Sequence, residues 1–166
     1  PLAVAGPRVQ EDLCPLLPRD AGHILVAGCV CFPASWTLAQ KINRPLRAIH
    51  NPVARYDDAL NQRIERIFAN LTPANPMWRA NWLRYNSAAL HHPLKEYQHR
   101  PFDPAGPFLV RVERQTLRRL PRSNAIVFGI HTFLVPRSAL TPVQSQSLDA
   151  IPLPPAPAAA TTTGRR

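Results

Sequence analysis

The sequence predicts an α+β domain in which an antiparallel sheet carries helices on one face. Three observations predict it. An apolar, β-branched run occupies residues 23–32, an amphipathic helix is expected over 57–71, and strands are expected at 77–85, 108–117 and 125–135. Strands that follow one another through non-helical connections pair antiparallel, so the helices gather on one face.

The first half of the chain alternates prolines with short elements. Residues 1–22 are proline-rich and lack periodicity, which predicts an irregular amino-terminal arm with room for one short strand that begins near Asp12. A buried strand is expected at 23–32, and Ser35 caps a short helix that ends near Lys41. The best helix lies at 57–71, where apolar residues recur every three or four positions: Leu60, Ile64, Ile67, Phe68 and Leu71.

The second half of the chain is mostly strand. Alternation in the strand at 77–85 places Trp78 and Trp82 on one side and Arg79 and Asn81 on the other. Residues 86–107 form a long polar loop in which His91, His92 and His99 are expected to be solvated rather than metal-bound. The two strands at 108–117 and 125–135 pair through a short turn, and residues 141–166 form a disordered Pro/Ala/Thr-rich tail.

Composition allows one domain of ordinary size together with tails. The 166 residues include 20 prolines, which we assign to loops and the tail, and the formal net charge is +10. Such a charge fits nucleic acid, an anionic membrane surface, an acidic protein or an anionic cofactor. The arginines are spread along the chain rather than gathered in one block, so we expect no nucleic-acid partner.

We expect a cytoplasmic protein. No apolar run approaches the roughly 18 residues of a membrane span, and no signal peptide is recognisable, so no membrane association is predicted. The cysteines Cys14, Cys29 and Cys31 are odd in number, and two of them lie in the apolar run. This pattern favours buried packing in a reducing compartment over a disulfide scaffold.

His50 is the first candidate for a cofactor ligand. It lies among apolar residues between Pro45 and Pro52, and each proline biases the residue before it away from helix. A neutral imidazole held in such a bend suits a metal or haem-iron ligand. A buried histidine bonded to a backbone carbonyl would give the same pattern, so this stretch alone leaves both interpretations open.

The strand at 108–117 carries polar residues where a sheet core is expected. Glu113 and Gln115 share one face, and Arg114 lies on the other. A buried charge needs a partner, so we predict a polarised pocket opposite His50 in which Glu113 is joined by residues of the adjacent strands, Arg79, Asn81 and His131. The alternative is a hydrated face on which Glu113 and Arg111 form ordinary cross-strand pairs. The tryptophans either fill the core or stack on a planar cofactor.

Five blocks of sequence carry a resemblance more specific than any single motif. They are Cys31-Phe32-Pro33 with Trp36; Lys41-Ile42 through Ile49-His50 to Pro52-Val53; Trp78-Arg79-Ala80-Asn81-Trp82; Val112-Glu113-Arg114-Gln115-Thr116 to Pro121; and Phe128-Gly129-Ile130-His131-Thr132-Phe133. In this order, between Gly22 and Leu140, they are similar to the haem-dependent oxidative N-demethylase family. The element order also resembles the Per-Arnt-Sim (PAS) sensor fold, whose sheet and helices enclose a cofactor cavity.

The resemblance implies a PAS-like haem-binding domain at residues 23–140 that acts as a catalytic subunit. It would oxidise a methyl group of a small secondary amine such as dimethylamine with O2 and release formaldehyde. Electrons would originate from NADPH and pass through FMN and 2Fe-2S centres on flavin and iron–sulfur reductase subunits. Haem b would be bound through iron by His50, with Arg79, Asn81 and Trp82 lining the cofactor; the implied catalytic residues are Glu113, Gln115, Arg114 and His131.

Two features depart from the family. His131 stands where the family usually has an arginine, which implies different hydrogen bonding to bound oxygen. The tail at 141–166 replaces a helical carboxyl-terminal portion, which implies altered docking of partners or an inactive member. A haem-based gas or redox sensor without turnover is the alternative function, and the charge alone supports a nucleic-acid-binding module as a third.

Overall fold

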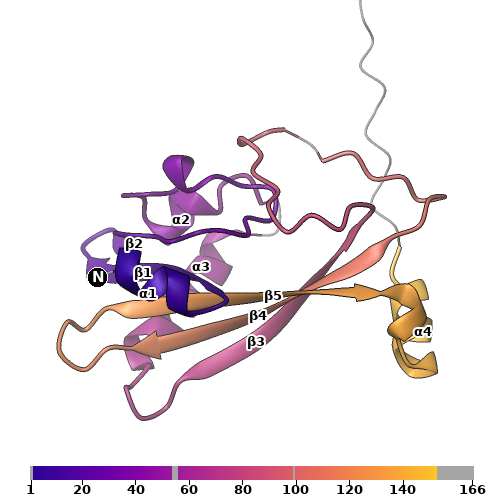
Figure 1. Ribbon diagram of the computed structural model, residues 1–166. Helices are drawn as coiled ribbons and strands as arrows, with labels where there is room; N and C mark the ends of the chain where they lie inside the picture. Colours follow the sequence, from indigo (N-terminus) through magenta and orange to yellow (C-terminus); the bar gives the residue numbers. More distant parts are fainter. Residues whose placement is uncertain (1, 54–55, 99, 153–166) are drawn as a thin grey trace, which may run out of the picture.

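The fold is built on a five-stranded antiparallel sheet of strand order β2-β1-β5-β4-β3. A computed structural model describes residues 2–53, 56–98 and 100–152 (Figure 1). The strands are β1 (Glu11–Arg19), β2 (Gly22–Leu25), β3 (Met77–Tyr85), β4 (Leu109–Arg119) and β5 (Ile126–Pro136). The helices are α1 (Leu2–Ala5), α2 (Leu46–Ile49), α3 (Asp58–Asn70) and α4 (Pro142–Asp149), with 3-10 turns η1 (Gly6–Arg8), η2 (Leu38–Gln40) and η3 (Arg137–Ala139). The predicted α+β class and antiparallel sheet are confirmed; the enclosed PAS-like cavity stays a prediction.

The helices α2 and α3 cover one face of the sheet, called here the inner face. Asp57 begins α3 by accepting a hydrogen bond from the Leu60 amide at 2.8 Å. Arg119 of β4 donates to the Leu71 and Phe68 carbonyls, which satisfies the carboxyl end of the same helix. The core lies between these helices and the sheet, and its buried members are Cys14, Leu16, Leu25, Leu46, Phe68, Leu71 and Ile126.

The segment expected to form an irregular arm contains β1, a central strand paired with β2 and β5. Its prolines suggested loop because proline cannot donate to a ladder. Both prolines, however, lie where no donor is needed. Pro15 opposes Val26, just past the end of β2, and its carbonyl accepts from the Val26 amide at 3.0 Å. Pro18 lies beyond Leu16, the last β1 residue paired with β5.

The strand expected at 23–32 is shorter, because β2 ends at Leu25. Opposite the missing Pro15 donor the ladder stops, and the chain continues without regular structure except for a bridge between Leu13 and Cys29. The helix expected after Ser35 is only the 3-10 turn at Leu38–Gln40. The helix at 57–71, the strand at 77–85, the loop at 86–107 and the last two strands are confirmed in place.

Part of the expected disordered tail is ordered. Residues 142–149 form α4, which begins with a capping box between Thr141 and Gln144. Arg84 of β3 donates to the Leu148 carbonyl at the end of this helix, at 2.5 Å, and to Ile151 at 3.0 Å. Residues 153–166 lie outside the described residues. In the described part of the chain, no helix has the length and apolar character needed to cross a bilayer.

Candidate functional site

His50 ends the short helix α2, and its ring is held in one orientation. Its Nδ1 lies 2.9 Å from the Leu46 carbonyl oxygen. A carbonyl can only accept, so Nδ1 carries the proton and Nε2 is left with its lone pair. Histidines that bind metals commonly have this arrangement, in which the second ring nitrogen donates to a carbonyl. The two interpretations left open by the sequence are therefore compatible, since a carbonyl bond at Nδ1 leaves Nε2 available as a ligand.

A stacked aromatic ring and nearby charges complete the surroundings of His50. The Tyr56 ring is buried and stacks on the imidazole at 4.2 Å between centroids, with 11° between the planes. Burial, together with the positive charges of Lys41 and Arg79, lowers the pKa of His50 below its ordinary value. The imidazole is consequently neutral at neutral pH, which is the protonation state that an iron ligand requires.

A row of polar side chains runs along the inner face of β4 and reaches β3. We call Arg111, Glu113, Gln115 and Arg79 the inner polar row. Arg111 Nε donates to Glu113 Oε1 at 3.2 Å, and Gln115 Nε2 donates to Glu113 Oε2 at 3.2 Å. Arg79 Nε donates to Gln115 Oε1 at 2.8 Å. The prediction that Glu113 and Gln115 point between sheet and helices is confirmed, because both are buried.

The row ends at the surroundings of His50. Arg79 acts electrostatically on the imidazole and also bonds Gln115, so it links the two halves of the candidate site. Asn81 is half-buried on the same face, directly opposite Glu113 in the β3–β4 register. The structure thus brings together four of the predicted residues, Arg79, Asn81, Glu113 and Gln115, and the charge of Arg79 also acts on a fifth, His50.

The other three predicted residues lie on the opposite face, called here the outer face. His131 is paired with Arg114 in the β4–β5 register, so both lie opposite to Glu113. His131 Nδ1 is 3.0 Å from Glu11 Oε1, and this hydrogen bond lowers the pKa of Glu11. Trp82 also lies on the outer face. The expected pocket shared by Glu113 and His131 is therefore not formed, because alternation along β4 and β5 separates them by the sheet.

Two anchoring residues, Arg111 and Asp12, are not among the predicted site residues. Arg111 is 0% exposed and donates to the carbonyls of Phe32 and Leu90, which ties two loops to the sheet. Asp12 of β1 is buried and accepts from the amides of Cys31 and Phe32. An arginine and an aspartate in apolar strands are themselves a signal, since a charge buried on a core face must have partners.

A buried ion pair between Lys41 and Glu96 lies beside His50. Lys41 is buried, and its Nζ donates to the Ile49 carbonyl at 2.6 Å and to Glu96 Oε1 at 2.7 Å. The hydrogen bond from Lys41 lowers the pKa of Glu96. This contact holds the loop between β3 and β4 against α2. Sequence reasoning missed it because Lys41 and Glu96 are far apart in the chain.

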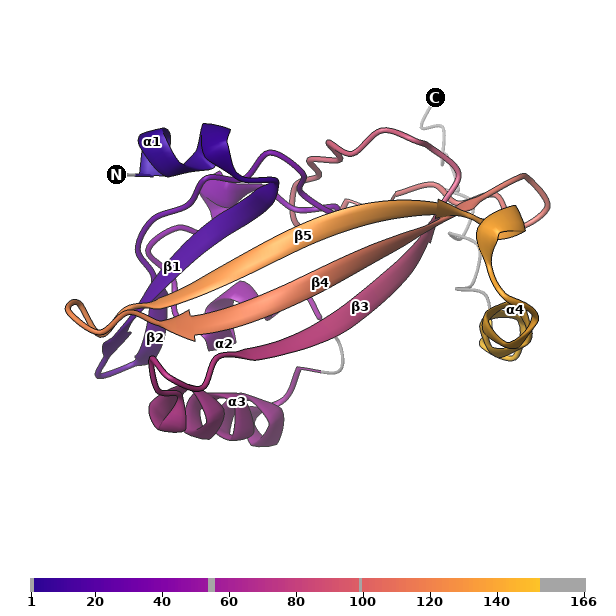
Figure 2. The same ribbon diagram turned by 60° about the horizontal axis from the view of Figure 1, so that its bottom comes forward.

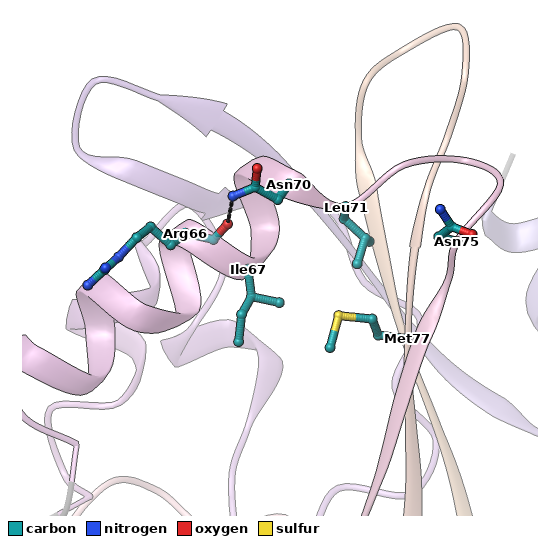
Figure 3. A pocket seen from close by; sticks show the side chains of 6 residues that line it. All are labelled: Arg66, Ile67, Asn70, Leu71, Asn75 and Met77. Carbon is teal, nitrogen blue, oxygen red and sulfur yellow. Dashed lines mark hydrogen bonds between the residues drawn. The ribbon is translucent and has the colours of Figure 1, made fainter.

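Two clefts lined by described residues lie away from His50. One, of about 380 Å³, lies between the end of α3 and the start of β3, where Ile67 and Met77 border the space (Figure 3). The other, of about 430 Å³, is bordered by Tyr85, His92 and Arg100 of the long loop region. Across the described ranges, no three His, Cys, Asp or Glu side chains are grouped to hold a metal ion.

A family model described as haem-dependent oxidative N-demethylase, alpha subunit-like, matches residues 1–151. The chain belongs to this family. The matched residues include β1 and α4, both of which lie outside the stretch between Gly22 and Leu140 that carries the sequence resemblance. The family description connects the chain with haem-dependent oxidative N-demethylation and with an enzyme of several subunits. The residues around His50 fit a haem, since they supply one neutral nitrogen ligand and a cation, Arg79, for an anionic propionate, whereas the charge of Lys41 is already paired with Glu96.

Proposed function

We propose that this chain binds haem b through His50 and catalyses oxidative N-demethylation of a small secondary amine such as dimethylamine. The observation that carries the proposal is the imidazole of His50, with Nδ1 bonded to the Leu46 carbonyl and Nε2 available, in a chain of this family. The haem, when bound, supplies activation of O2. All other parts of the reaction depend on how the protein side chains bind and orient the amine and its protons.

His50 is the proposed iron ligand, and Tyr56 fixes the plane of its ring. The stacked contact and the Nδ1 bond together leave the imidazole little rotational freedom. Arg79 is the proposed partner of a haem propionate, because it reaches the surroundings of His50 from β3. Asn81, half-buried beside it, would line the same space.

Glu113 is the proposed site for the ammonium form of the amine. Both of its oxygens accept one hydrogen bond within the inner polar row, and each keeps a further lone pair for a substrate N–H. A buried carboxylate next to the amine attracts the cation and is able to take and return a proton. Gln115 would orient this carboxylate, because it bonds Glu113 on one side and Arg79 on the other.

The proposal includes electrons that originate from NADPH and arrive through partner subunits carrying FMN and 2Fe-2S centres. The supporting observation is the family description as an alpha subunit. The implied catalytic roles of Arg114 and His131, and cofactor contact by Trp82, are not carried into this proposal, since these side chains lie on the outer face.

The first experiment compares His50→Ala with His91→Ala in protein produced with added haem precursor. The His91 Nδ1 also lies 2.9 Å from a backbone carbonyl oxygen, that of Cys31, so it is a matched control. We expect the Soret band of bound haem to be lost or shifted in His50→Ala and unchanged in His91→Ala. An unchanged spectrum in His50→Ala would remove His50 as the ligand.

The second experiment tests turnover. Haem-loaded protein, dithionite, O2 and dimethylamine are mixed, and formaldehyde is assayed. We expect product from the natural sequence and at least tenfold less from Glu113→Gln with the same Soret band, because the neutral side chain no longer attracts the ammonium group. Haem binding without formaldehyde would favour the sensor alternative.

A further inference from the structure

The outer face of the sheet exposes large aromatic side chains on β3 and β5. Trp78 is 71% exposed and Phe133 is 42% exposed. Trp82 pairs with Val112, which pairs with Phe133, so these three form one row across the strands. In Figure 2 the middle of these strands lies in front, with α1 near one end of the face and α4 at the other. Exposed apolar patches of this kind mark interaction sites.

The same surface carries positive charge. Arg118 and Arg114 of β4 are exposed on the outer face, beside the aromatic residues. Arg114 forms an ion pair of 3.8 Å with Glu11 Oε1, an oxygen that also lies 3.0 Å from His131 Nδ1. We call Trp78, Trp82, Phe133, Arg114 and Arg118 the outer patch. Tryptophan and arginine are the residues most enriched in the energetic centres of protein interfaces.

The charge argues against two occupants available from the chain itself. A second copy brings the same net charge of +10, so two outer patches would repel. The stretch 153–166 contains Arg165 and Arg166 and no Asp or Glu, so it offers no complementary charge. An acidic partner fits, and the family description as a subunit points to a protein rather than nucleic acid.

The chemistry of the proposed function defines what such a partner must supply. Removal of one methyl group from dimethylamine follows (CH3)2NH + O2 + 2e⁻ + 2H⁺ → CH3NH2 + HCHO + H2O. Two electrons must therefore reach the site in each turnover. The inner face holds the candidate site, and only the thickness of the sheet separates it from the outer patch, since Arg79 and Trp78 are neighbours in β3.

We infer that the outer patch is the docking surface for an acidic electron-carrier protein, an inference that rests on the proposed function. Trp78 and Phe133 provide the apolar centre of the contact, and Arg114 and Arg118 attract the acidic rim of the partner. Docking on this face delivers electrons through the sheet while substrate enters from the inner side.

The test uses the full chain loaded with haem and a small acidic 2Fe-2S ferredoxin as the probe. Binding is measured by calorimetry, and haem reduction by reduced ferredoxin is followed by stopped-flow absorbance. We expect Trp78→Ala and Arg118→Glu each to weaken binding and slow reduction by about tenfold or more, the effect of losing an interface hot spot. Dithionite-driven formaldehyde release should stay the same in both variants.

Two control variants match these changes elsewhere on the surface. Tyr97→Asn removes an aromatic ring that is 73% exposed in the long loop, and Arg63→Glu makes the same charge change as Arg118→Glu on an exposed position of α3. Both should alter ferredoxin binding by less than about twofold.

The inference is overturned if dithionite drives turnover but ferredoxin does not bind, or if all four variants bind it equally. Steeply salt-dependent binding of a twelve-base oligo(dT) that Trp78→Ala abolishes would assign the patch to nucleic acid instead. Failure of the proposed function gives a different result, the absence of a Soret band or of dithionite-driven formaldehyde.

Discussion

Removal of the Arg111 guanidinium should destabilise the protein more than any other single change in the inner polar row. Arg111 donates to the Leu90 carbonyl at 2.8 Å, to the Phe32 carbonyl and to Glu113 Oε1 at 3.2 Å, and it is 0% exposed. Arg111→Met keeps a similar shape without the donors. Two loop carbonyls then lose the guanidinium in the interior, and the Glu113 carboxylate, which is only 6% exposed, loses its cation and keeps only the bond from Gln115.

The size of the effect follows from these contacts. Removing one member of a buried ion pair typically costs about 3–5 kcal/mol, because the remaining charge is left uncompensated. The two bonds to carbonyls are charge-assisted, and each is ordinarily worth about 1.5–3 kcal/mol, so together they give about 3–6 kcal/mol, which overlaps that range. Arg111→Lys keeps the positive charge but loses the planar guanidinium whose several N–H groups reach different acceptors, so we expect about half of that loss in the free energy of unfolding.

Urea denaturation followed by tryptophan fluorescence measures the free energy of unfolding. The double variant Arg111→Met/Glu113→Gln removes both charges and leaves a neutral side chain that Gln115 still bonds. We expect it to be more stable than Arg111→Met by at least about 1 kcal/mol, since the uncompensated charge is gone. A loss below about 1 kcal/mol in Arg111→Met, or strictly additive effects in the double variant, would refute this reasoning.

Three further predictions follow from single contacts. Burial, with the charges of Lys41 and Arg79, lowers the pKa of His50 in the folded protein below its ordinary value of 6.5. The contribution of neutral His50 to stability is therefore present above pH 6.5 and is lost as the pH falls through the pKa of the folded state. Haem titrations should give constant affinity from about pH 8 to about pH 6.5 and weaker binding only below. Tyr56→Phe should keep the haem spectrum and lower the free energy of unfolding by about 1 kcal/mol, because the hydrogen bond to Asn61 is lost. Tyr56→Ala should alter the spectrum and lower the free energy of unfolding by about 3 kcal/mol. Thr141→Ala should lower thermal stability by about 1 kcal/mol through loss of the α4 cap, and Ser138→Ala should not.

Periodicity predicted the elements whose energy comes from one buried face. The helix at 57–71 and the strands of the second half have apolar residues at regular spacing, and these elements form where expected. At β1 only a short strand near Asp12 was expected within an irregular arm, because Pro15 and Pro18 imitate a loop. Whether a proline is tolerated in a strand depends on where the neighbouring strands end, and that information lies in tertiary structure rather than in the local sequence.

The candidate site was predicted in part for a similar reason. Alternation already separated Glu113 from Arg114 and Asn81 from Trp82, and the structure keeps both separations. His131 was misplaced because its face depends on the register between β4 and β5, which no local pattern specifies. The Lys41–Glu96 contact joins distant segments, so only the folded chain shows it.

The two faces of β4 should act independently in spite of their shared backbone. β4 is paired with β5 along its whole length and with β3 from Leu109 to Leu117, which fixes its register at both edges. A slip of one residue would bring Arg114 into the core and expose Glu113, so the fold excludes it.

Glu113 and Arg118 have no side-chain partner in common among the contacts of the described residues. The effects of Glu113→Gln on turnover and of Arg118→Glu on ferredoxin binding should therefore combine additively within about 0.5 kcal/mol, measured as rate and affinity ratios in the double variant. Coupling above about 1 kcal/mol would show that the sheet transmits a change between its faces and would contradict their separate roles.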